Sequence, residues 1–165
     1  MTRRQLSGHC LCGAVRYTVR GAPLMTALCH CDDCQRSSGS AFSINVGVRA
    51  SDLQVEGELQ TYETIGTDTH ERRQRRFCPK CGSQVLTVVA ETPGLVVLKA
   101  GTLDDRSWLS PRTEVWRQSA QSWTQRRQAR ARLGRGVPSA IARPVNGLLN
   151  RLIGRPESDT AGVRE

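Results

Sequence analysis

Three cysteines near the start of the chain have the spacing of metal ligands. One residue separates Cys29 from Cys31, and two residues separate Cys31 from Cys34. A C-x-x-C turn brings two sulfurs to one side of the backbone, and a bent C-x-C segment can direct both of its sulfurs to one metal ion. Three thiolates fill three corners of a tetrahedral zinc site and leave the fourth corner open to a reacting group. The segment therefore predicts a catalytic zinc site.

The remaining four cysteines form a second set, drawn from two distant segments. One residue separates Cys10 from Cys12, and two residues separate Cys78 from Cys81. Four thiolates suit a closed structural zinc site, whose binding energy adds directly to folding. All seven cysteines of the chain are then used by two zinc ions per chain, one structural and one catalytic.

A purely structural role stays open for the three-cysteine set. It would be a second structural zinc site if His30 or a remote residue supplied the fourth ligand. His30 lies between two of the thiols, so its side chain is expected to point away from the metal that they share. His9 and His70 are remote in sequence and could reach either site.

An open zinc site suits thiol chemistry. The cation stabilises a thiolate, so a substrate thiol loses its proton near neutral pH. The sulfur can then add to an aldehyde carbonyl, and a nearby acid or hydrogen-bond donor must protonate the new alkoxide. The sequence does not choose among the local donors and acceptors, which are Asp32, Asp33, Ser37, Ser38 and Ser40.

The elements that must position these residues are predicted to be short β-strands. Alternating or continuous apolar residues, broken by Gly and Pro, predict strands at 15–19, 24–28, 41–48, 53–56, 59–65, 84–90 and 95–100, with a last edge strand at 114–117. We expect a turn or one helical turn at 35–40, an exposed strand or loop at 70–77, and Trp123 as an anchor on the body. Apolar residues make up 38% and aromatic residues 4% of the chain. The hydrophobic core is therefore expected to be small, and a bound metal ion is a plausible way to stabilise it.

Composition also bounds the class and location of the protein. The first residues contain no apolar run that could serve as a signal peptide, and the odd, clustered cysteines do not suit disulfides, so we expect the reduced cytoplasm. No apolar stretch approaches the roughly 20 residues that cross a bilayer. Residues 124–165 hold 9 of the 24 Lys and Arg and 3 of the 15 Asp and Glu, which is +6 of the net charge of +9.

This distribution predicts a β domain at 5–123 and a basic tail at 124–165. The tail combines a basic helix former at 126–133, apolar residues near helical spacing at 141–153, and a disordered end. It could bind nucleic acid or lie on an anionic membrane surface. No aromatic residue follows Trp123 to stack on bases, and a plain solubilising extension is the simpler interpretation.

Taken together, the motifs resemble the glutathione-dependent formaldehyde-activating enzyme family, the domain also found in centromere protein V. The matching marks span about residues 5–123 and comprise Gly8-x-Cys10-x-Cys12-Gly13, Cys29-His30-Cys31-x-x-Cys34, Phe77-Cys78-x-x-Cys81-Gly82-Ser83, Gly101-Thr102-Leu103-Asp104-Asp105, Pro111 and Trp123.

The resemblance implies a mainly β, Mss4-like (β-tent-like) zinc fold. It implies a structural zinc on Cys10, Cys12, Cys78 and Cys81, and a catalytic zinc on Cys29, Cys31 and Cys34. The implied activity is that of a carbon–sulfur lyase, an S-(hydroxymethyl)glutathione synthase that condenses formaldehyde with glutathione, or the reverse.

Two further expectations follow from this resemblance. Glutathione carries two carboxylates, so Arg36 and then Arg49 are candidate clamps, unless they are ordinary solvated charges. Many relatives carry a His after the proline of the last strand, where this chain has Arg112-Thr-Glu-Val, so that role is absent here or is taken by Glu114. A second function class stays open, namely a non-catalytic two-zinc module whose basic tail docks to nucleic acid or a membrane.

Overall fold

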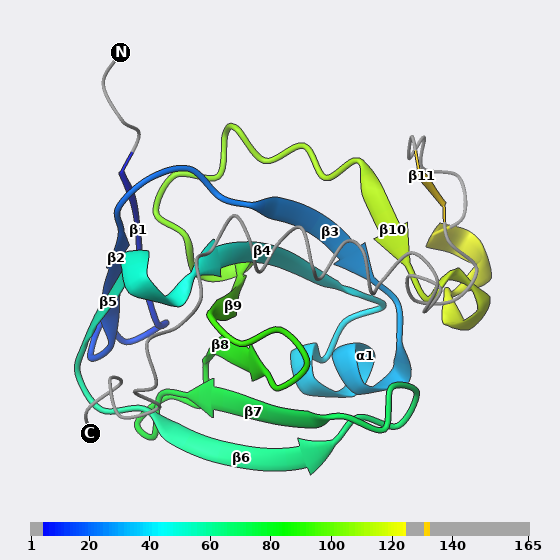
Figure 1. Cartoon of the computed structure of the whole chain (residues 1–165), viewed down its shortest axis with the longest axis horizontal. Helices are drawn as coiled ribbons and strands as arrows, with labels where there is room; N and C mark the ends of the chain where they lie inside the picture. The colour runs from blue at the N-terminus through cyan, green and yellow to red at the C-terminus, as the bar shows by residue number, and fades with distance from the viewer. Residues whose placement is uncertain (1–4, 125–130, 133–165) are drawn as a thin grey trace.

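The computed structural model describes residues 5–124 and 131–132, which form two β-sheets and one short α-helix (Figure 1). The smaller sheet is antiparallel, with strands in the order β1 (Leu6–His9), β2 (Arg16–Val19) and β5 (Leu53–Glu56). The larger sheet has the order β11 (Ala131–Arg132), β10 (Thr113–Val115), β3 (Met25–Cys29), β4 (Ser43–Arg49), β9 (Leu95–Lys99), β8 (Gln84–Val89), β7 (Arg72–Phe77) and β6 (Gln60–Ile65). The helix α1 spans Asp32–Ser38, and 3-10 helices lie at Ala50–Asp52, Ala100–Thr102, Arg117–Ser119 and Ser122–Thr124. The protein is therefore mainly β, as the sequence predicts.

The core lies between the two sheets. β2 contributes Tyr17 and Val19, and β4 contributes Val46 and Val48, which are fully buried. β-branched residues suit these strands because they pack well on a pleated surface, and burying each of these valines contributes about 1.5–3 kcal/mol. The alternation of apolar residues in the sequence thus gives the core face of each sheet.

Gly8 marks the closest approach between β1 and the chain that follows β9. A Cβ at this position would lie 2.3 Å from the Tyr17 hydroxyl and 2.4 Å from the Thr102 carbonyl oxygen. Only glycine permits this contact. It lets Gly8 form a β-bridge with Leu103, which joins the smaller sheet to the end of β9.

Strand register brings the three-cysteine segment to the middle of the larger sheet. Cys29 ends β3, where it pairs with Ser43 of β4 on one side and with Val115 of β10 on the other. β10 runs parallel to β3, whereas β4 runs antiparallel to it. The chain turns from Cys29 directly into α1, so the segment that carries the three cysteines lies where β3, α1 and β10 meet (Figure 1).

Four local expectations differ from the structure. The helix begins at Asp32, inside the cysteine motif, because Cys31 acts as its N-cap and Gly39 ends it in a left-handed conformation. β7 is a half-buried inner strand rather than an exposed one, because β6 and β8 pair on both of its sides. β10 lies between β3 and β11 and is no edge. Trp123 is no anchor, since 71% of its surface is exposed.

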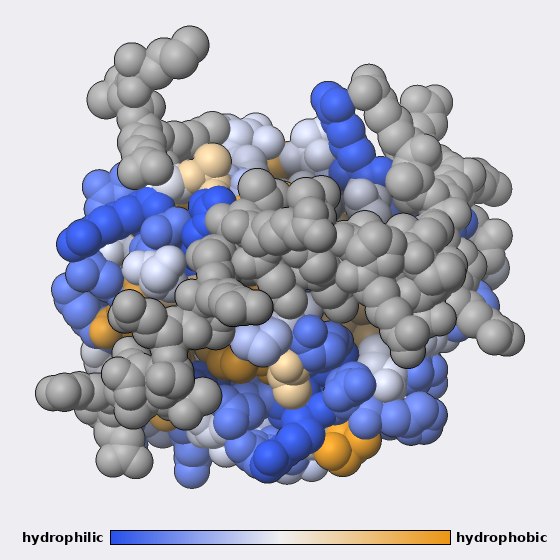
Figure 2. Space-filling model, in the orientation of Figure 1, coloured by the Kyte–Doolittle hydropathy of each residue, from blue (hydrophilic) through white to orange (hydrophobic). Residues whose placement is uncertain are grey.

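Apart from the grey residues, the face shown in Figure 2 is largely hydrophilic, with hydrophobic residues in small scattered groups. No helix of the described residues is long and apolar enough to cross a membrane. Of the basic helix predicted at 126–133, only residues 131–132 are described, and there the prediction is wrong, because they pair with β10 as the strand β11. The helix predicted at 141–153 and the disorder predicted after it lie outside the described residues.

Candidate metal centres

The four-cysteine set comes together where the turns after β1 and β7 meet. The Sγ atoms of Cys10, Cys12, Cys78 and Cys81 all lie within 4.8 Å of one another. The separation is 3.5 Å between Cys10 and Cys12 and 3.8 Å between Cys12 and Cys78. A tetrahedral zinc ion with Zn–S bonds of about 2.3 Å needs sulfurs about 3.8 Å apart. The four thiols therefore fit a zinc ion.

The two turns share one backbone geometry around their sulfurs. The amides of Gly13 and Gly82 donate to the carbonyls of Cys10 and Cys78, respectively, and both glycines have φ near 70°. Only glycine adopts this conformation without strain. The Val15 amide also donates to the Cys10 sulfur at 3.3 Å. Such bonds stabilise thiolates, so the turns are shaped to hold a metal ion.

The four-cysteine set is also a structural joint. Cys10 and Cys78 are fully buried within the core cluster, whereas Cys12 is exposed. The hydroxyl and then the amide of Ser83 hold the pKa of Cys81 down at about 5, which favours the thiolate that a metal requires. A metal ion here would connect the smaller sheet with the β7–β8 turn of the larger one.

The three-cysteine set has a different setting. Cys29 ends β3, Cys31 caps α1 and Cys34 lies in its first turn, and their sulfurs lie within 4.8 Å of one another. The Cys29 and Cys31 sulfurs are 3.5 Å apart, and the Cys34 amide donates to the Cys31 sulfur at 3.4 Å. This spacing also fits a zinc ion. Within the described residues no fourth His, Cys, Asp or Glu donor atom joins the three.

The three thiols differ in their tendency to ionise. Hydrogen bonds from Cys29 and then Cys31, followed by the positive charges of Lys99 and Arg75, hold the pKa of Cys34 far below its ordinary value. The pKa of Cys29 moves the other way, since it is the donor to its neighbours and is buried. The cluster is therefore poised to carry negative charge at Cys34, which favours a bound cation.

His30 lies between two of these thiols but does not contribute to the cluster. It is 1% exposed, its ring meets Phe42 edge-on at 5.5 Å, and its Nε2 lies 3.6 Å from the Glu114 carboxylate. Burial lowers the pKa of His30, so the ring is neutral near pH 7. Glu114 is likewise 1% exposed and accepts a hydrogen bond from Arg117. Both residues are therefore buried close to the motif in sequence or strand register, and neither offers a ligand atom to the thiol cluster.

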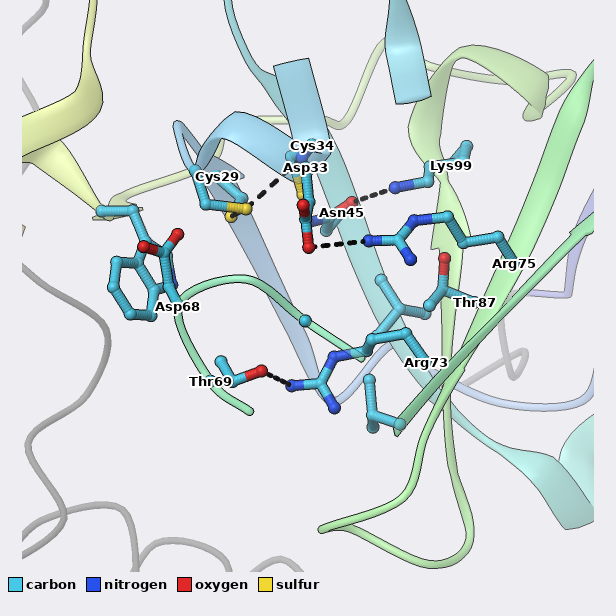
Figure 3. A pocket seen from close by; sticks show the side chains of 15 residues that line it. Cys29, Asp33, Cys34, Asn45, Asp68, Thr69, Arg73, Arg75, Thr87 and Lys99 are labelled. Carbon is cyan, nitrogen blue, oxygen red and sulfur yellow. Dashed lines mark hydrogen bonds and ion pairs between the residues drawn. The ribbon is translucent and has the colours of Figure 1, made fainter. Parts of the chain in front are cut away.

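A cavity of about 150 Å³ opens beside the three sulfurs (Figure 3). Its opposite wall carries Arg73 and Arg75 from β7 and Lys99 from β9. Glu91 neutralises Arg73 through two hydrogen bonds of 2.5 Å. Lys99 instead donates to two neutral oxygens, Ser43 Oγ at 3.0 Å and Asn45 Oδ1 at 3.2 Å, so its charge is directed at the thiols.

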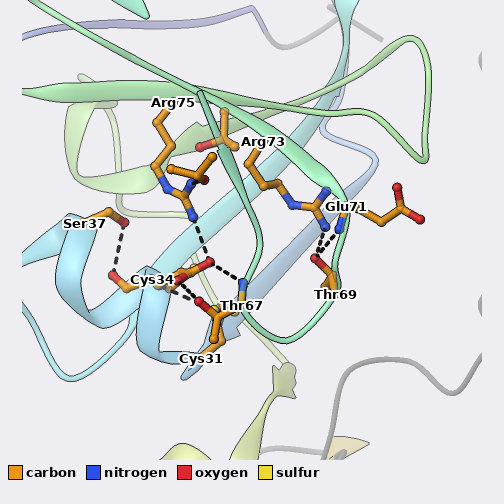
Figure 4. Close-up of polar contacts among 12 residues, drawn as sticks. Cys31, Cys34, Ser37, Thr67, Thr69, Glu71, Arg73 and Arg75 are labelled. Carbon is orange, nitrogen blue, oxygen red and sulfur yellow. Dashed lines mark hydrogen bonds and ion pairs between the residues drawn. The ribbon is translucent and has the colours of Figure 1, made fainter. Parts of the chain in front are cut away.

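The β6–β7 loop closes one side of this cavity and is tied to α1. The Asp33 carboxylate accepts from the Thr67 amide at 3.2 Å, from the Thr67 hydroxyl at 2.8 Å, and from Arg75 at 3.2 Å (Figure 4). These bonds fix the loop against the helix that carries Cys34. They also place Asp68, the next residue of the loop, in the cavity wall (Figure 3).

The predicted clamps lie away from the cavity. Arg36 is exposed on α1 and is not among the lining residues. Arg49 lies at the far end of β4 from Ser43 and contacts Asp52 at 3.6 Å. Asp32 is exposed as well. Sequence reasoning missed the cations that do line the cavity, although the arginine run of β7 and a lone lysine ending a Val- and Leu-rich strand were visible signals.

The fold and the two clusters define a class of β-rich proteins. These proteins have one cluster of four cysteines where two sheets meet and a separate cluster of three cysteines beside a cavity. Residues 5–119 match the family described as glutathione-dependent formaldehyde-activating enzyme. The chain belongs to this family.

Two similar proteins illustrate this relationship. A protein of Halomonas elongata named "Putative glutathione-dependent formaldehyde-activating enzyme" is 31% identical over 103 residues, which is 60% of this chain. The match spans 66% of the length of that relative. A crystal structure of a Rhodobacter sphaeroides protein shares the fold, with a TM-score of 0.52 and 24% identity over 66% of this chain and 99% of the other.

Proposed function

We propose that the chain is a zinc-dependent carbon–sulfur lyase that joins glutathione to formaldehyde as S-hydroxymethylglutathione, or reverses that reaction. The observation that carries this proposal is the three-thiol cluster, which has protein donors on one side and a cavity lined by cations on the other. The family match and the name of the Halomonas relative support the choice of substrates.

Cys29, Cys31 and Cys34 would hold the ion, which would supply Lewis-acid stabilisation of a substrate thiolate. Three cysteine thiolates and a substrate thiolate outweigh the charge of a zinc ion by two. Lys99 offsets part of this charge, since its hydrogen-bond acceptors are neutral. Arg75 offsets less, because Asp33 already pairs with it.

The reaction transfers a proton and involves no net oxidation or reduction. The thiol sulfur forms a bond to the carbonyl carbon, the carbon–oxygen π bond breaks, and the thiol proton ends on the new hydroxyl oxygen. Asp33 and Asp68 are the carboxyl groups of the lining. Asp33 is engaged by Arg75 and Thr67, whereas Asp68 is exposed, and partial desolvation followed by the charges of Asp32 and Asp33 raises the pKa of its carboxyl. We assign the proton transfer to Asp68.

Cobalt substitution tests the proposal without relying on turnover. With cobalt in both clusters, glutathione should change the ligand-field and charge-transfer bands of one site only, with release of a proton. Cys31→Ala is the matched control, because it should lose this response and keep the spectrum of the four-cysteine site. A wild-type spectrum that ignores millimolar glutathione would mean that the three-cysteine site is closed, and the lyase proposal would be abandoned.

A further inference from the structure

The larger sheet has an open edge at β6. This strand ends the strand order of the sheet, and among the described residues no strand pairs with its outer side (Figure 1). β6 is six residues long, whereas the other edge strands, β1 and β5, have four residues each, and β11 has two described residues. A long open edge presents a row of backbone donors and acceptors to which another strand can add.

The sequence of β6 lacks the usual protection of an edge strand. Native edges are protected by lysine, by proline or by a β-bulge. β6 contains neither lysine nor proline, and its pairing with β7 runs without a register shift. Its one charged side chain, Glu63, is engaged by Arg72 at 2.9 Å. Tyr62 is 62% exposed and Ile65 is 59% exposed, so the edge presents apolar side chains as well as backbone groups.

Alternate residues of β6 direct their backbone groups to the open edge. The amide of Gly66, which directly follows β6, donates to the carbonyl of Glu71 at 2.8 Å. Hydrogen-bonded and non-hydrogen-bonded pairs alternate along an antiparallel ladder, so the even-numbered residues of β6 bond to β7. The odd-numbered residues, Thr61, Glu63 and Ile65, then direct their N–H and C=O groups outwards.

A second copy of β6 fits this edge in one register. Two antiparallel copies related by a twofold axis at Tyr62 place each Thr61 opposite the Glu63 of the other copy as a hydrogen-bonded pair. The two Tyr62 side chains then lie directly opposite each other. Ile65 lies opposite the second copy of Leu59, which directly precedes β6. Both exposed apolar side chains of the edge therefore gain an apolar neighbour.

The neighbouring registers are less favourable. An axis at Glu63 places two carboxylates directly opposite each other, which is destabilising. An axis at Thr61 places Tyr62 opposite Gln60 and Ile65 opposite Gly57, so neither apolar side chain gains an apolar neighbour. An axis between two residues would pair side chains that point to opposite faces of the sheet, and it is excluded.

We propose that β6 is a dimer interface, at which two copies of this chain join their larger sheets edge to edge with the twofold axis at Tyr62. About four backbone hydrogen bonds form around the axis, and the two aromatic rings meet on one face. Tyr62 pairs with Arg75, which lines the three-cysteine cavity, so both cavities open on the same face of the joined sheet. A strand pair buries less than a standard interface, so the dimer is reversible, with micromolar affinity.

Sedimentation equilibrium of the zinc-loaded full chain, from micromolar to millimolar concentration, measures this dimer. Tyr62→Glu removes the ring pair and places two carboxylates opposite each other at the axis, so it should weaken the dimer about tenfold. Gln60→Glu is the matched control, because it adds the same charge to the same strand away from the axis. It should leave the dimer within about threefold. Both side chains are exposed, so both variants should melt as wild type does.

Cysteine substitution reads the register. Opposite Cα atoms in a non-hydrogen-bonded pair are about 4.5 Å apart, which is within reach of a disulfide. Tyr62→Cys should therefore form a covalent dimer under mild oxidation. Thr61→Cys and Glu63→Cys should not, because neither residue faces its own counterpart. Wild type, treated in the same way, is the control for linkage through the native thiols.

A wild type that stays monomeric at millimolar concentration would overturn the proposal. A dimer that Tyr62→Glu leaves as stable as wild type would also overturn it, because the copies would then meet at another surface. If removal of residues 126–165 abolishes the dimer and Tyr62→Glu does not weaken it, that surface is the tail. Covalent linkage of Thr61→Cys or Glu63→Cys in place of Tyr62→Cys would overturn the axis at Tyr62.

Discussion

Cys12→Ala isolates what a metal ion contributes to the stability of the fold. Cys12 is the exposed member of the four-cysteine set, so its removal deletes a ligand without opening a hole in the core. The adjacent Leu11 is 84% exposed and contributes no ligand atom. Leu11→Ala is therefore the matched control from the same turn.

The expected loss of stability can be worked out from the number of ligands at the site. Structural zinc sites contribute about 10–16 kcal/mol, so one ligand in four represents roughly 3–4 kcal/mol. Each kcal/mol shifts the melting temperature of a chain of this size by about 2–4 °C. Cys12→Ala should thus melt roughly 6–16 °C below wild type. Leu11→Ala should melt within about 2 °C of wild type, because surface substitutions seldom change stability by more than about 0.5 kcal/mol.

Cys31→Ala should cost no more than Cys12→Ala, about 3 kcal/mol in all. The four-cysteine site joins distant residues, such as Cys12 and Cys78, which are 66 positions apart, and closing such a loop removes about 4 kcal/mol of chain entropy from the unfolded state. The three-cysteine site closes a loop of six residues, for which the same relation gives about 2 kcal/mol. Losing Cys31 also removes the N-cap of α1, at about 1 kcal/mol.

The assay is circular dichroism melting together with zinc analysis. Wild type should hold two zinc ions per chain, and each cysteine variant should lose the ion of its own site. If Cys12→Ala melts no lower than Leu11→Ala, the four cysteines do not stabilise the fold through a metal. If Cys31→Ala melts clearly lower than Cys12→Ala, the three-cysteine site stabilises the fold by more than its short loop and the N-cap allow, and it is structural too.

Three further outcomes are expected. Burial raises the pKa of Tyr17 to about 12, so the unfolded chain ionises first. Stability is complete below about pH 10 and falls by about 3 kcal/mol as the pH rises to about 12. Tyr17→Phe should flatten this part of the urea-unfolding profile, and an unchanged slope would contradict it. Glu114→Gln should destabilise the fold by about 3 kcal/mol, because it leaves Arg117 without its carboxylate in a mostly buried place. Adding Arg117→Met should restore part of that loss, and a simple sum of the two effects would show that the pair is not coupled. A chain ending after Gln125 should keep both zinc ions and melt within about 4 °C of wild type, since every ligand lies before that point. A larger loss would show that the tail packs on the domain.

The gathering of the cysteines within each motif could be predicted because their spacing is a local property. A C-x-C or C-x-x-C turn positions its sulfurs through a few backbone angles, so Cys29, Cys31 and Cys34 gather as the sequence predicts. The strands were predictable for the same reason, since alternation along one segment gives its buried face. The clamps on Arg36 and Arg49 were inferred from closeness in sequence alone.

The cations of the cavity could not be placed in this way. Lys99 reaches the thiols because β9 pairs with β4, which in turn pairs with β3. Arg75 reaches them from β7, which lies two strands beyond β9 in the sheet, on the far side of β8. Such placement depends on strand order, which no single segment encodes. The prediction that Trp123 anchors its segment was wrong for a different reason. It relied on the general tendency of large aromatic side chains to be buried, and this tendency does not say whether the fold covers a particular residue.

The difference in span between the two cysteine sets has a consequence for synthesis. The thiols of the segment Cys29–Cys34 leave the ribosome almost together, so this set can take up a metal ion as soon as it emerges. Cys10 and Cys12 must wait for Cys78, 66 residues after Cys12, which is roughly 3–13 s at about 5–20 residues per second. During that interval the first pair of thiols is exposed without its partners. The joint between the two sheets is therefore completed second, and oxidants or competing metals act on the nascent chain chiefly at Cys10 and Cys12.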